Sequence, residues 1–507
     1  MFEKANELKS YGIQSPFLQE LIWFHRINDD QDSELLALEF FNVCASHARL
    51  GKLFDKSLKT VSHRMDVQLR IILYFFPELD EIYLSKVDDL DKWQKTISTL
   101  EQKLENRHYD FTYLQKRFDS FETFHQAVKV LRNASLGIQN SRRWTSKFLY
   151  PFSFQTLFVD LHNTKLNNDR RFFSRGGEVL YLMISRGQNA HIFKALLEEV
   201  FEQNIQNQRW NELINAFRSD LEAENMSSPP LGFLRFESHK IFDQLVDDLI
   251  ALFRVNIPNN DLFYHFAIVS SFYMVHFILT VASQIHKTSL IEGDEEKVIY
   301  PIEILAPRSD HSRRASRQIY KINEELPLKA LAKTLENYCK GLQSLSDKDA
   351  LLKQLEDELN YSDENDQYDD IINLDQLCKN IWTSISKKAK DDLLPIHRIL
   401  LKGAGLASAK KTNSYRYLAS DEWLKTFVLI NVSERMPFDE FINVLYEKYG
   451  FIISNKHSGL LIETYSNNDF KKNESRLFER LRALGLLESK SDGYAYVLNR
   501  YGRKGKL

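Results

Sequence analysis

Glycine and proline, the two residues that favour tight turns, are both scarce in the sequence. Glycine occurs 17 times and proline 11 times among 507 residues. β-Sandwiches and barrels need many such turns, so this scarcity favours helices. Hydrophobic residues make up 43% of the chain and charged residues 27%, which is an ordinary globular composition. We therefore predict a mainly α-helical protein of several domains.

Cysteine is also scarce and is not spaced for metal binding. Cys44, Cys339 and Cys378 lie far apart in the sequence, and no CxxC pair occurs. Disulfide frameworks and zinc sites need cysteines in pairs or clusters. We expect three free thiols, a reducing compartment and no bound metal.

Neither a strong net charge nor a common nucleotide or hydrolase motif is present. The formal net charge is −3, so any contact with nucleic acid must come from local basic patches. Walker A, GxGxxG, GxSxG and HExxH motifs are all missing. Hydrolysis of nucleotides by this chain is therefore not expected, and no cofactor is predicted.

One apolar segment, residues 262–286, contains no Asp, Glu, Lys or Arg. It is just long enough to span a bilayer, but it carries His265, His276 and several serines. These polar residues favour a buried helix of a soluble core over a membrane span. The N-terminal segment MFEKANELKSYG lacks the apolar core of a secretory signal, so we expect a cytoplasmic protein without membrane contact.

Changes in composition divide the chain into four expected parts. We predict an N-terminal helical domain at 1–140, a central helical domain at 141–300, a helical connector at 301–395 and a winged-helix domain at 396–507. Within the connector, residues 300–325 contain two prolines and several cations and are predicted as a linker or surface loop. Residues 356–370 contain many carboxylates and indicate a solvated loop between domains.

The last ninety residues carry the clearest pattern. Ser420 is a natural N-cap for a helix over 420–432, and a second helix follows between Pro437 and Gly450. Residues 451–454 form a short apolar β segment, and a third helix is expected over 473–485. Two strands then flank an Asp492-Gly493 turn. This order is typical of a winged helix-turn-helix.

Cations of this C-terminal region could contact DNA. Such cations neutralise phosphates, and the polar side of a recognition helix reaches base edges. On the third helix the polar side is predicted to contain Asn473, Ser475, Arg476, Arg480 and Arg482; the wing and tail add Lys490, Arg500, Arg503 and Lys504. Glutamates dilute this surface, so docking of a protein is the alternative interpretation.

Two further basic segments are candidate nucleic-acid contacts. Arg170, Arg171 and Arg175 alternate with phenylalanines and could hold a single strand by charge and stacking. The alternative is a loop whose arginines meet carboxylates such as Glu178. The second segment contains Arg313, Arg314, Arg317 and Lys321. Helical spacing would place Arg314, Arg317 and Lys321 on one stripe that tracks phosphates, or on a plain solvated face.

Two histidine patterns also have a functional and a structural interpretation. Arg186 and His191 match the R-x4-H spacing of all-helical, HEPN-like ribonucleases, in which such a pair acts on the scissile phosphate. The spacing also arises by chance, and no supporting helix is identified. His265 and His276 lie three turns apart and are predicted as hydrogen-bonded core histidines rather than metal ligands.

Three stretches of the sequence resemble a known group of proteins. They are WTSKFLYPFSFQTLFVDL (144–161), RRFFSRGGEVLYLMISRG (170–187) and YRYLASDEWLKTFVLINV through FDEFINVLYEKYGFII (415–453). Together they resemble the helical accessory subunit of bacterial methylation-associated, anti-phage defence systems. The resemblance implies a restriction-like complex with partners such as an ATPase, a nuclease or a methyltransferase, and carries over no catalytic residue.

These patterns leave three hypotheses. The first is a non-enzymatic DNA-binding or scaffold subunit of a bacterial defence system, with DNA, or RNA, among its partners. The second is an RNase effector that uses Arg186 and His191. The third is an adaptor whose winged helix only docks another protein.

Overall fold

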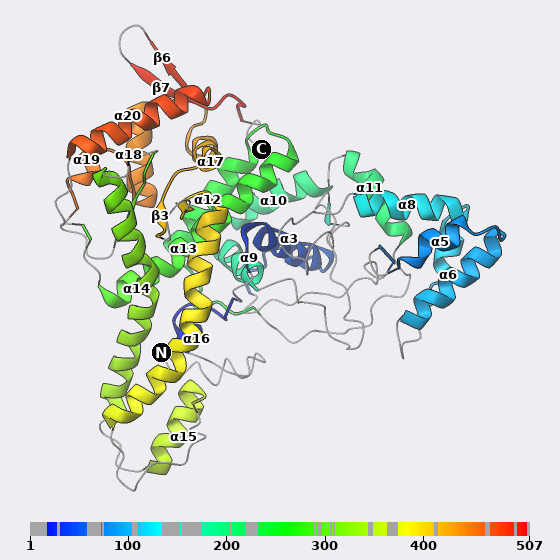
Figure 1. The fold of residues 1–507 in the computed structure, drawn as a ribbon, viewed down its shortest axis with the longest axis horizontal. Coiled ribbons are helices and arrows are strands. Elements are labelled where there is room, and N and C mark those ends of the chain that lie inside the picture. Colours follow the sequence, from blue (N-terminus) through cyan, green and yellow to red (C-terminus); the bar gives the residue numbers. More distant parts are fainter. Residues whose placement is uncertain are drawn as a thin grey trace. The chain divides into compact units, whose positions relative to one another are not determined.

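The fold is mainly helical, as the composition predicts (Figure 1). It is seen in a computed structural model of the chain. The structure describes residues 18–27, 31–57, 72–73, 76–103, 110–133, 153–154, 175–202, 205–217, 232–287, 290–291, 297–304, 307, 310–342, 348–361, 374–409, 414–461, 467–490 and 494–503.

The chain forms two compact units, each assembled from separate parts of the sequence. Unit 1 contains residues 1–37, 174–193 and 232–507, and unit 2 contains residues 38–173 and 194–231. Two helices, α3 (Ser33–Arg49) and α10 (Ala190–Glu202), begin in unit 1 and end in unit 2. The candidate site lies in unit 1.

The body of unit 1 is a set of helices packed around α13 (Asn259–His286). The other helices of this body are α2 (Leu18–Ile22), α9 (Gly176–Arg186), α12 (Lys240–Phe253), α14 (His311–Gly341), α15 (Lys348–Leu359) and α16 (Leu374–Gly403). Because α13 is apolar on all sides, neighbouring helices can cover its whole surface.

Helix α13 is long and apolar enough to span a membrane, yet it is buried inside the protein. Trp23 donates a hydrogen bond from Nε1 to the carbonyl oxygen of Ile278 at 3.2 Å. His265 bonds Thr426 at 2.7 Å and His276 bonds the Tyr300 hydroxyl at 2.8 Å. The predictions of a buried helix and of hydrogen-bonded core histidines are confirmed.

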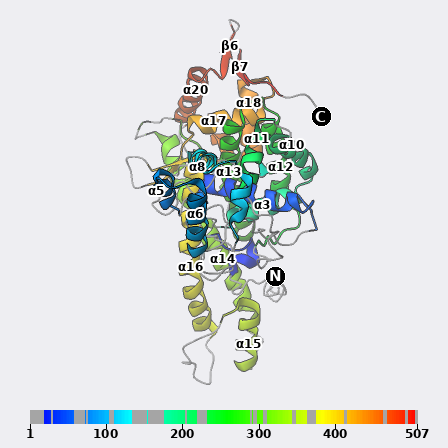
Figure 2. The ribbon, with the colours of Figure 1, turned by 90° about the vertical axis from the view of Figure 1, so that its right-hand side faces the viewer.

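Helices α14 and α16 pack side by side, with α15 next to their far ends (Figures 1 and 2). The expected linker over 300–325 is wrong, because Tyr300 and Pro301 form strand β1 and α14 begins at His311. Asp310 caps this helix by accepting a hydrogen bond from the Ser312 amide. The apolar side of α14 is buried. The acidic loop expected over 356–370 lies largely outside the described residues, although 356–359 belong to α15.

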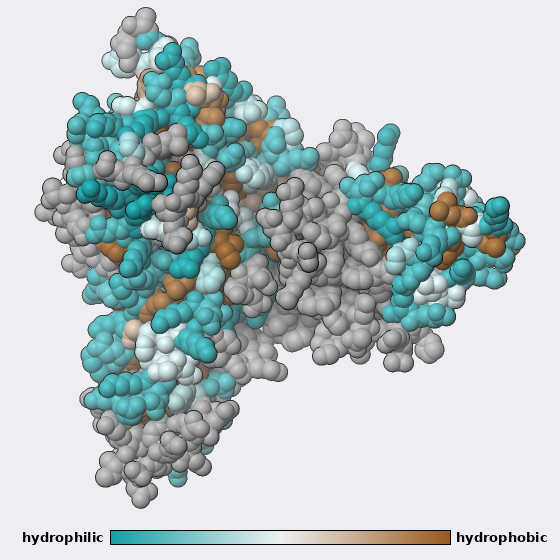
Figure 3. Space-filling model, viewed as in Figure 1, coloured by the Kyte–Doolittle hydropathy of each residue, from teal (hydrophilic) through white to brown (hydrophobic). Residues whose placement is uncertain are grey.

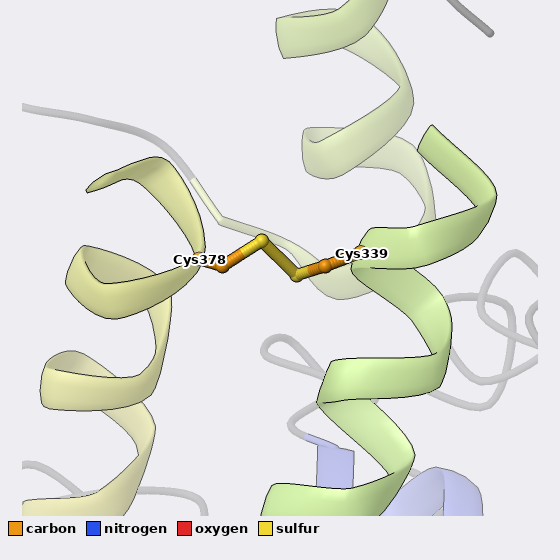
Figure 4. Close-up of a disulfide and its surroundings, with 2 residues drawn as sticks. All are labelled: Cys339 and Cys378. Carbon is orange, nitrogen blue, oxygen red and sulfur yellow. A yellow bond between two sulfur atoms is a disulfide. The ribbon is translucent and has the colours of Figure 1, made fainter. Parts of the chain in front are cut away.

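A disulfide joins these two long helices. Cys339 of α14 and Cys378 of α16 are bonded, with their Cα atoms 6.3 Å apart (Figure 4). The expectation of three free thiols is therefore wrong for this pair, while Cys44 is free and buried. Sequence spacing could not show the pair, because 39 residues separate two cysteines that the helical hairpin brings together.

The C-terminal module, defined here as residues 421–503, combines helices with a small sheet. Its elements are α17 (Asp421–Asn431), β4 (Arg435–Pro437), α18 (Phe438–Tyr449), β5 (Phe451–Ile452), α19 (Asn455–Ser458), α20 (Asn467–Ala483), β6 (Leu487–Ser489) and β7 (Ala495–Leu498). Strands β4, β7 and β6 form an antiparallel sheet in that order. The module is a helical segment closed by a β-ribbon.

Strand β5 does not belong to the three-stranded sheet of the module. Residues 451–454 were predicted as the short strand of the module, but β5 pairs in parallel with β1, Phe451 opposite Tyr300. Strand β4 joins the ribbon instead. Gly450 follows the last residue of α18 and adopts a φ of +76°, as predicted for a glycine that ends a helix. A second two-stranded pair, β2 (Ala407–Ser408) and β3 (Arg416–Tyr417), precedes the module.

Unit 2 has its own aromatic core. Its helices include α5 (Glu78–Leu84), α6 (Asp89–Lys103), α7 (Thr112–Arg117), α8 (Phe121–Asn133) and α11 (Ile205–Ala216). Phe124 lies at its centre, with ring centroids 4.9 Å from Trp93 and 5.9 Å from Phe217. Arg132 donates hydrogen bonds to the carbonyl oxygens of Leu73 and Phe76, which fixes the end of α8.

Candidate functional site in the C-terminal module

Helix α20 is held in place by a buried asparagine. The Asn473 side chain is fully buried and donates hydrogen bonds to the carbonyl oxygens of Ile302 and Ile453. Its Oδ1 accepts a hydrogen bond from the Ile304 amide at 2.8 Å. Asn473 therefore satisfies the backbone beside β1 and β5, and its predicted place on the polar face of the helix is wrong.

Two of the three predicted arginines of α20 form ion pairs with carboxylates of the chain. Arg476 Nη2 lies 2.9 Å from Oδ2 of Asp310, whose side chain is only 3% exposed. Arg480 Nε lies 2.6 Å from Oδ1 of Asp421 at the start of α17. In such an ion pair the carboxylate already neutralises the guanidinium group that would otherwise contact a phosphate. These two arginines stabilise the packing of α20.

The remaining predicted cations of the module are spread over several surfaces. Arg482 is exposed on α20, and Lys490 lies over the Tyr496 ring at 5.3 Å. Arg500 donates to the carbonyl oxygen of Gly485 and Arg503 to that of Ile430. Lys504 lies outside the described residues. Sequence reasoning did not single out Lys471, which is exposed on the same face of α20 as Arg482. Lys472 is exposed as well, but it lies 3.4 Å from Asp469.

A groove of about 600 Å³ lies between the start of α18, helix α20 and strand β7. Aromatic rings form part of its wall: Phe438 packs edge-to-face on Phe478 with centroids 5.4 Å apart, and Tyr494 is 66% exposed. Figure 3 shows that the surface over α20 and the ribbon is mainly hydrophilic with a few apolar side chains. The groove itself is lined by both carboxylates and aromatic rings.

The charged residues that line this groove are all acidic. They are Asp439, Glu474 and Glu479. Within the described part of the chain, none of the three forms an ion pair. Burial and the nearby Asp439 raise the pKa of Glu474, and Lys471 offsets only part of this rise. A cationic group entering the groove would relieve this repulsion.

The other predicted sites serve mainly structural contacts where the structure describes them. Arg186 Nη1 donates hydrogen bonds to the carbonyl oxygens of Leu234 and Phe236 at 2.7 and 2.6 Å, and His191 is exposed on α10. The Arg175 guanidinium lies 3.7 Å from Glu178, as the structural alternative for that segment expects. Arg170 and Arg171 lie outside the described residues.

The predicted stripe on α14 is only partly exposed. Arg314 and Lys321 face solvent, whereas Arg313 and Arg317 are half-buried. A phosphate-tracking surface needs its cations on one accessible side. The described geometry leaves two cations available on this stripe.

Comparison with protein-family models, with curated proteins and with solved structures finds no match to this chain. The geometry of the groove and of its neighbouring charges is therefore the basis for a functional assignment.

Proposed function

We propose that the chain is a non-enzymatic scaffold protein whose C-terminal module is a winged helix-turn-helix that docks a partner protein. The element order α17, β4, α18, α20, β6, β7 and the strand order β4-β7-β6 support this architecture. In it, α20 takes the place of the recognition helix and the β6–β7 ribbon that of the wing.

The acidic, aromatic-walled groove is the observation that carries the docking proposal. Nucleic acid presents phosphates, which the carboxylates of Asp439, Glu474 and Glu479 repel. A protein segment with lysine or arginine next to an apolar side chain matches both the charge and the rings. The partner is therefore a cationic, amphipathic segment of another protein.

The sequence resemblance offers a setting for this partner. On that resemblance alone, we propose that the partner is another subunit of a bacterial anti-phage assembly. The ribonuclease alternative receives no support from the contacts of Arg186, because its guanidinium is used to hold backbone carbonyl groups.

Fluorescence anisotropy with a labelled peptide tests the docking proposal. We use a short amphipathic peptide of arginine and leucine, and the same peptide with glutamate in place of arginine. The full-length chain should bind only the cationic peptide, and salt should weaken that binding. The double variant Glu474→Gln and Glu479→Gln should bind at least about tenfold more weakly.

A matched control separates the groove from general acidity. Glu488 is exposed on β6 and does not line the groove, so Glu488→Gln should leave peptide affinity unchanged. Equal affinities of the wild type and the groove double variant would contradict the proposal.

Nucleic-acid binding is the second candidate, favoured by the exposed Lys471 and Arg482 on one face of α20. A gel-shift experiment with duplex DNA at low salt tests it. Saturable binding that is lost in a Lys471→Glu and Arg482→Glu variant, together with no peptide binding, would replace the docking proposal by the nucleic-acid one.

A further inference from the structure

A second concave site lies on the body of unit 1, away from the residues of the acidic groove. It is a pocket of about 320 Å³, lined by residues from α12, α13, α18 and the segment that leads into β1. We call it the lysine pocket because its wall includes Lys240, Lys297 and Lys448, with Glu447 as its one carboxylate. Three lysines from three different elements converge on one small volume.

These lysines are compensated to different degrees. Lys448 pairs with the buried Asp248, and Lys297 lies 3.7 Å from Glu447, whose side chain is 72% exposed. Lys240 forms no ion pair with a described residue. Lys240 is also the first residue of the 14-residue helix α12, so it adds to the positive end of that helix dipole. Positive potential therefore remains at the Lys240 side of the pocket.

The wall formed by α13 supplies neutral hydrogen-bonding groups. His276, Thr280 and Gln284 follow one another at four-residue intervals on one face of the helix. Thr280 is only 7% exposed, and its hydroxyl has no hydrogen bond to any residue that the structure describes. Buried hydroxyl groups are normally satisfied, so this one is available to a bound molecule.

His276 is a neutral member of this wall. Its Nδ1 bonds the Tyr300 hydroxyl, and when Nδ1 accepts that hydrogen bond the ring carries its proton on Nε2. Burial, Lys240 and His239 lower the pKa of His276 to about 3. The ring is thus a neutral hydrogen-bonding group at pH 7 beside the cations.

Ammonium groups, a hydroxyl and side-chain amides are donors that hold oxyanions in proteins. The volume lies at the lower end of the range for small-molecule sites. We propose that the lysine pocket binds the phosphate group of a small molecule, with Lys240 and Thr280 as contacts. This ligand site does not depend on the docking function of the groove.

Isothermal titration calorimetry of the full-length chain tests the proposal at constant ionic strength. The probes are inorganic phosphate, a nucleoside monophosphate and a short single-stranded oligonucleotide, which separate free phosphate, a small phosphate ester and a polymer. We expect saturable binding of phosphate or of the monophosphate. A pocket of about 320 Å³ is too small to hold the oligonucleotide, so tighter binding of the oligonucleotide than of both small probes would overturn the proposal.

Two variants and one control locate the site. Lys240→Gln should weaken binding by at least about tenfold, since it removes the uncompensated charge. Thr280→Val keeps the side-chain shape and should weaken binding about threefold to tenfold. Lys425→Gln changes an exposed lysine of α17 that does not line the pocket and should leave the affinity within about twofold. Thermal unfolding confirms that each variant is folded.

Two results would overturn the assignment. One is the absence of saturable binding of all probes. The other is equal affinities of the Lys240→Gln and Lys425→Gln variants.

Discussion

The acidic groove and the lysine pocket are both concave surfaces of unit 1, but they have opposite charge. In each, some charged side chains have no ion-pair partner among the described residues: Glu474 and Glu479 in the groove, and Lys240 in the pocket. Next to them, Arg476 and Arg480 on α20 are each paired with a carboxylate. The comparison therefore separates charges that hold the fold together from charges that face a possible ligand.

The number of charged residues along a helix therefore does not identify a binding surface. Helix α20 contains several cations, yet two of its arginines are used in ion pairs with Asp310 and Asp421, and the charged residues that line the groove are carboxylates. Paired charges should contribute to stability, whereas the unpaired charges of the groove and pocket should contribute to binding. Four variants test this division.

The largest effect is expected at Asp248, a fully buried carboxylate in an ion pair. It pairs with Lys448 and accepts hydrogen bonds from the hydroxyls of Tyr273 and Tyr449. Asp248→Ala leaves these groups without their partner and should lower the free energy of unfolding by about 3–5 kcal/mol. Urea unfolding measures the change.

The neighbouring Asp247 is exposed on the same helix and provides the control. Asp247→Ala should cost less than about 1 kcal/mol. Similar losses for the two variants would remove the distinction between buried and exposed carboxylates.

The disulfide tests a covalent pair by the same comparison. Cys339→Ser together with Cys378→Ser should lower the free energy of unfolding by about 2–4 kcal/mol, because the bond closes a loop with a sequence separation of 39. Urea unfolding with and without dithiothreitol measures this. In reductant, the wild type should have the same free energy of unfolding as the double variant, and Cys44→Ser should lose stability in reductant as the wild type does. A wild-type stability that does not change in reductant would contradict the pairing.

A smaller effect separates two arginines of the same helix. Arg476→Ala leaves the buried carboxylate of Asp310 without its cation and should cost about 1–3 kcal/mol. Arg482→Ala changes an exposed side chain and should stay within about 0.5 kcal/mol. Equal values in denaturant unfolding would show that the ion pair with Asp310 does not contribute.

The smallest effect is a pH dependence at Glu474. Its pKa in the folded protein is raised above 4.5 by burial and by Asp439. The stability that the protonated carboxyl contributes is complete below pH 4.5 and is lost as pH rises through the folded pKa. Glu474→Gln should therefore raise the melting temperature at pH 7 but not below pH 4.5. A difference that is constant with pH would contradict this assignment.

Much of the local structure follows from the sequence. Ser420 caps α17 by accepting a hydrogen bond from the Trp423 amide, and Gly450 ends α18 with a positive φ, both as predicted. The ribbon strands β6 and β7 lie on either side of the predicted turn, whose residues 491–493 lie outside the described part of the chain. Caps and turns depend on a few neighbouring residues, which is why one sequence suffices to predict them.

Contacts between distant segments were not predictable in this way. Nothing near Asn473 shows that it bonds the backbone at 302–304, and nothing near Arg476 shows that Asp310 is its partner. The acidic groove also went unnoticed, because Asp439 and Glu479 meet only after α18 and α20 pack together. The signal available beforehand was the share of glutamates on the third helix.

The parallel pairing of β1 with β5 has a consequence for any attempt to separate the C-terminal module from the rest of the chain. Tyr300 and Pro301 lie more than a hundred residues before the module, yet they pair with its strand β5. A side-chain methyl group at position 450 would overlap the Val298 carbonyl oxygen, so the close approach of this segment requires Gly450. A recombinant fragment that starts at residue 415 would expose this edge and remove the hydrogen bonds of Asn473 with Ile302 and Ile304. Grafting the module onto another protein would therefore require the 297–304 segment to be transplanted with it.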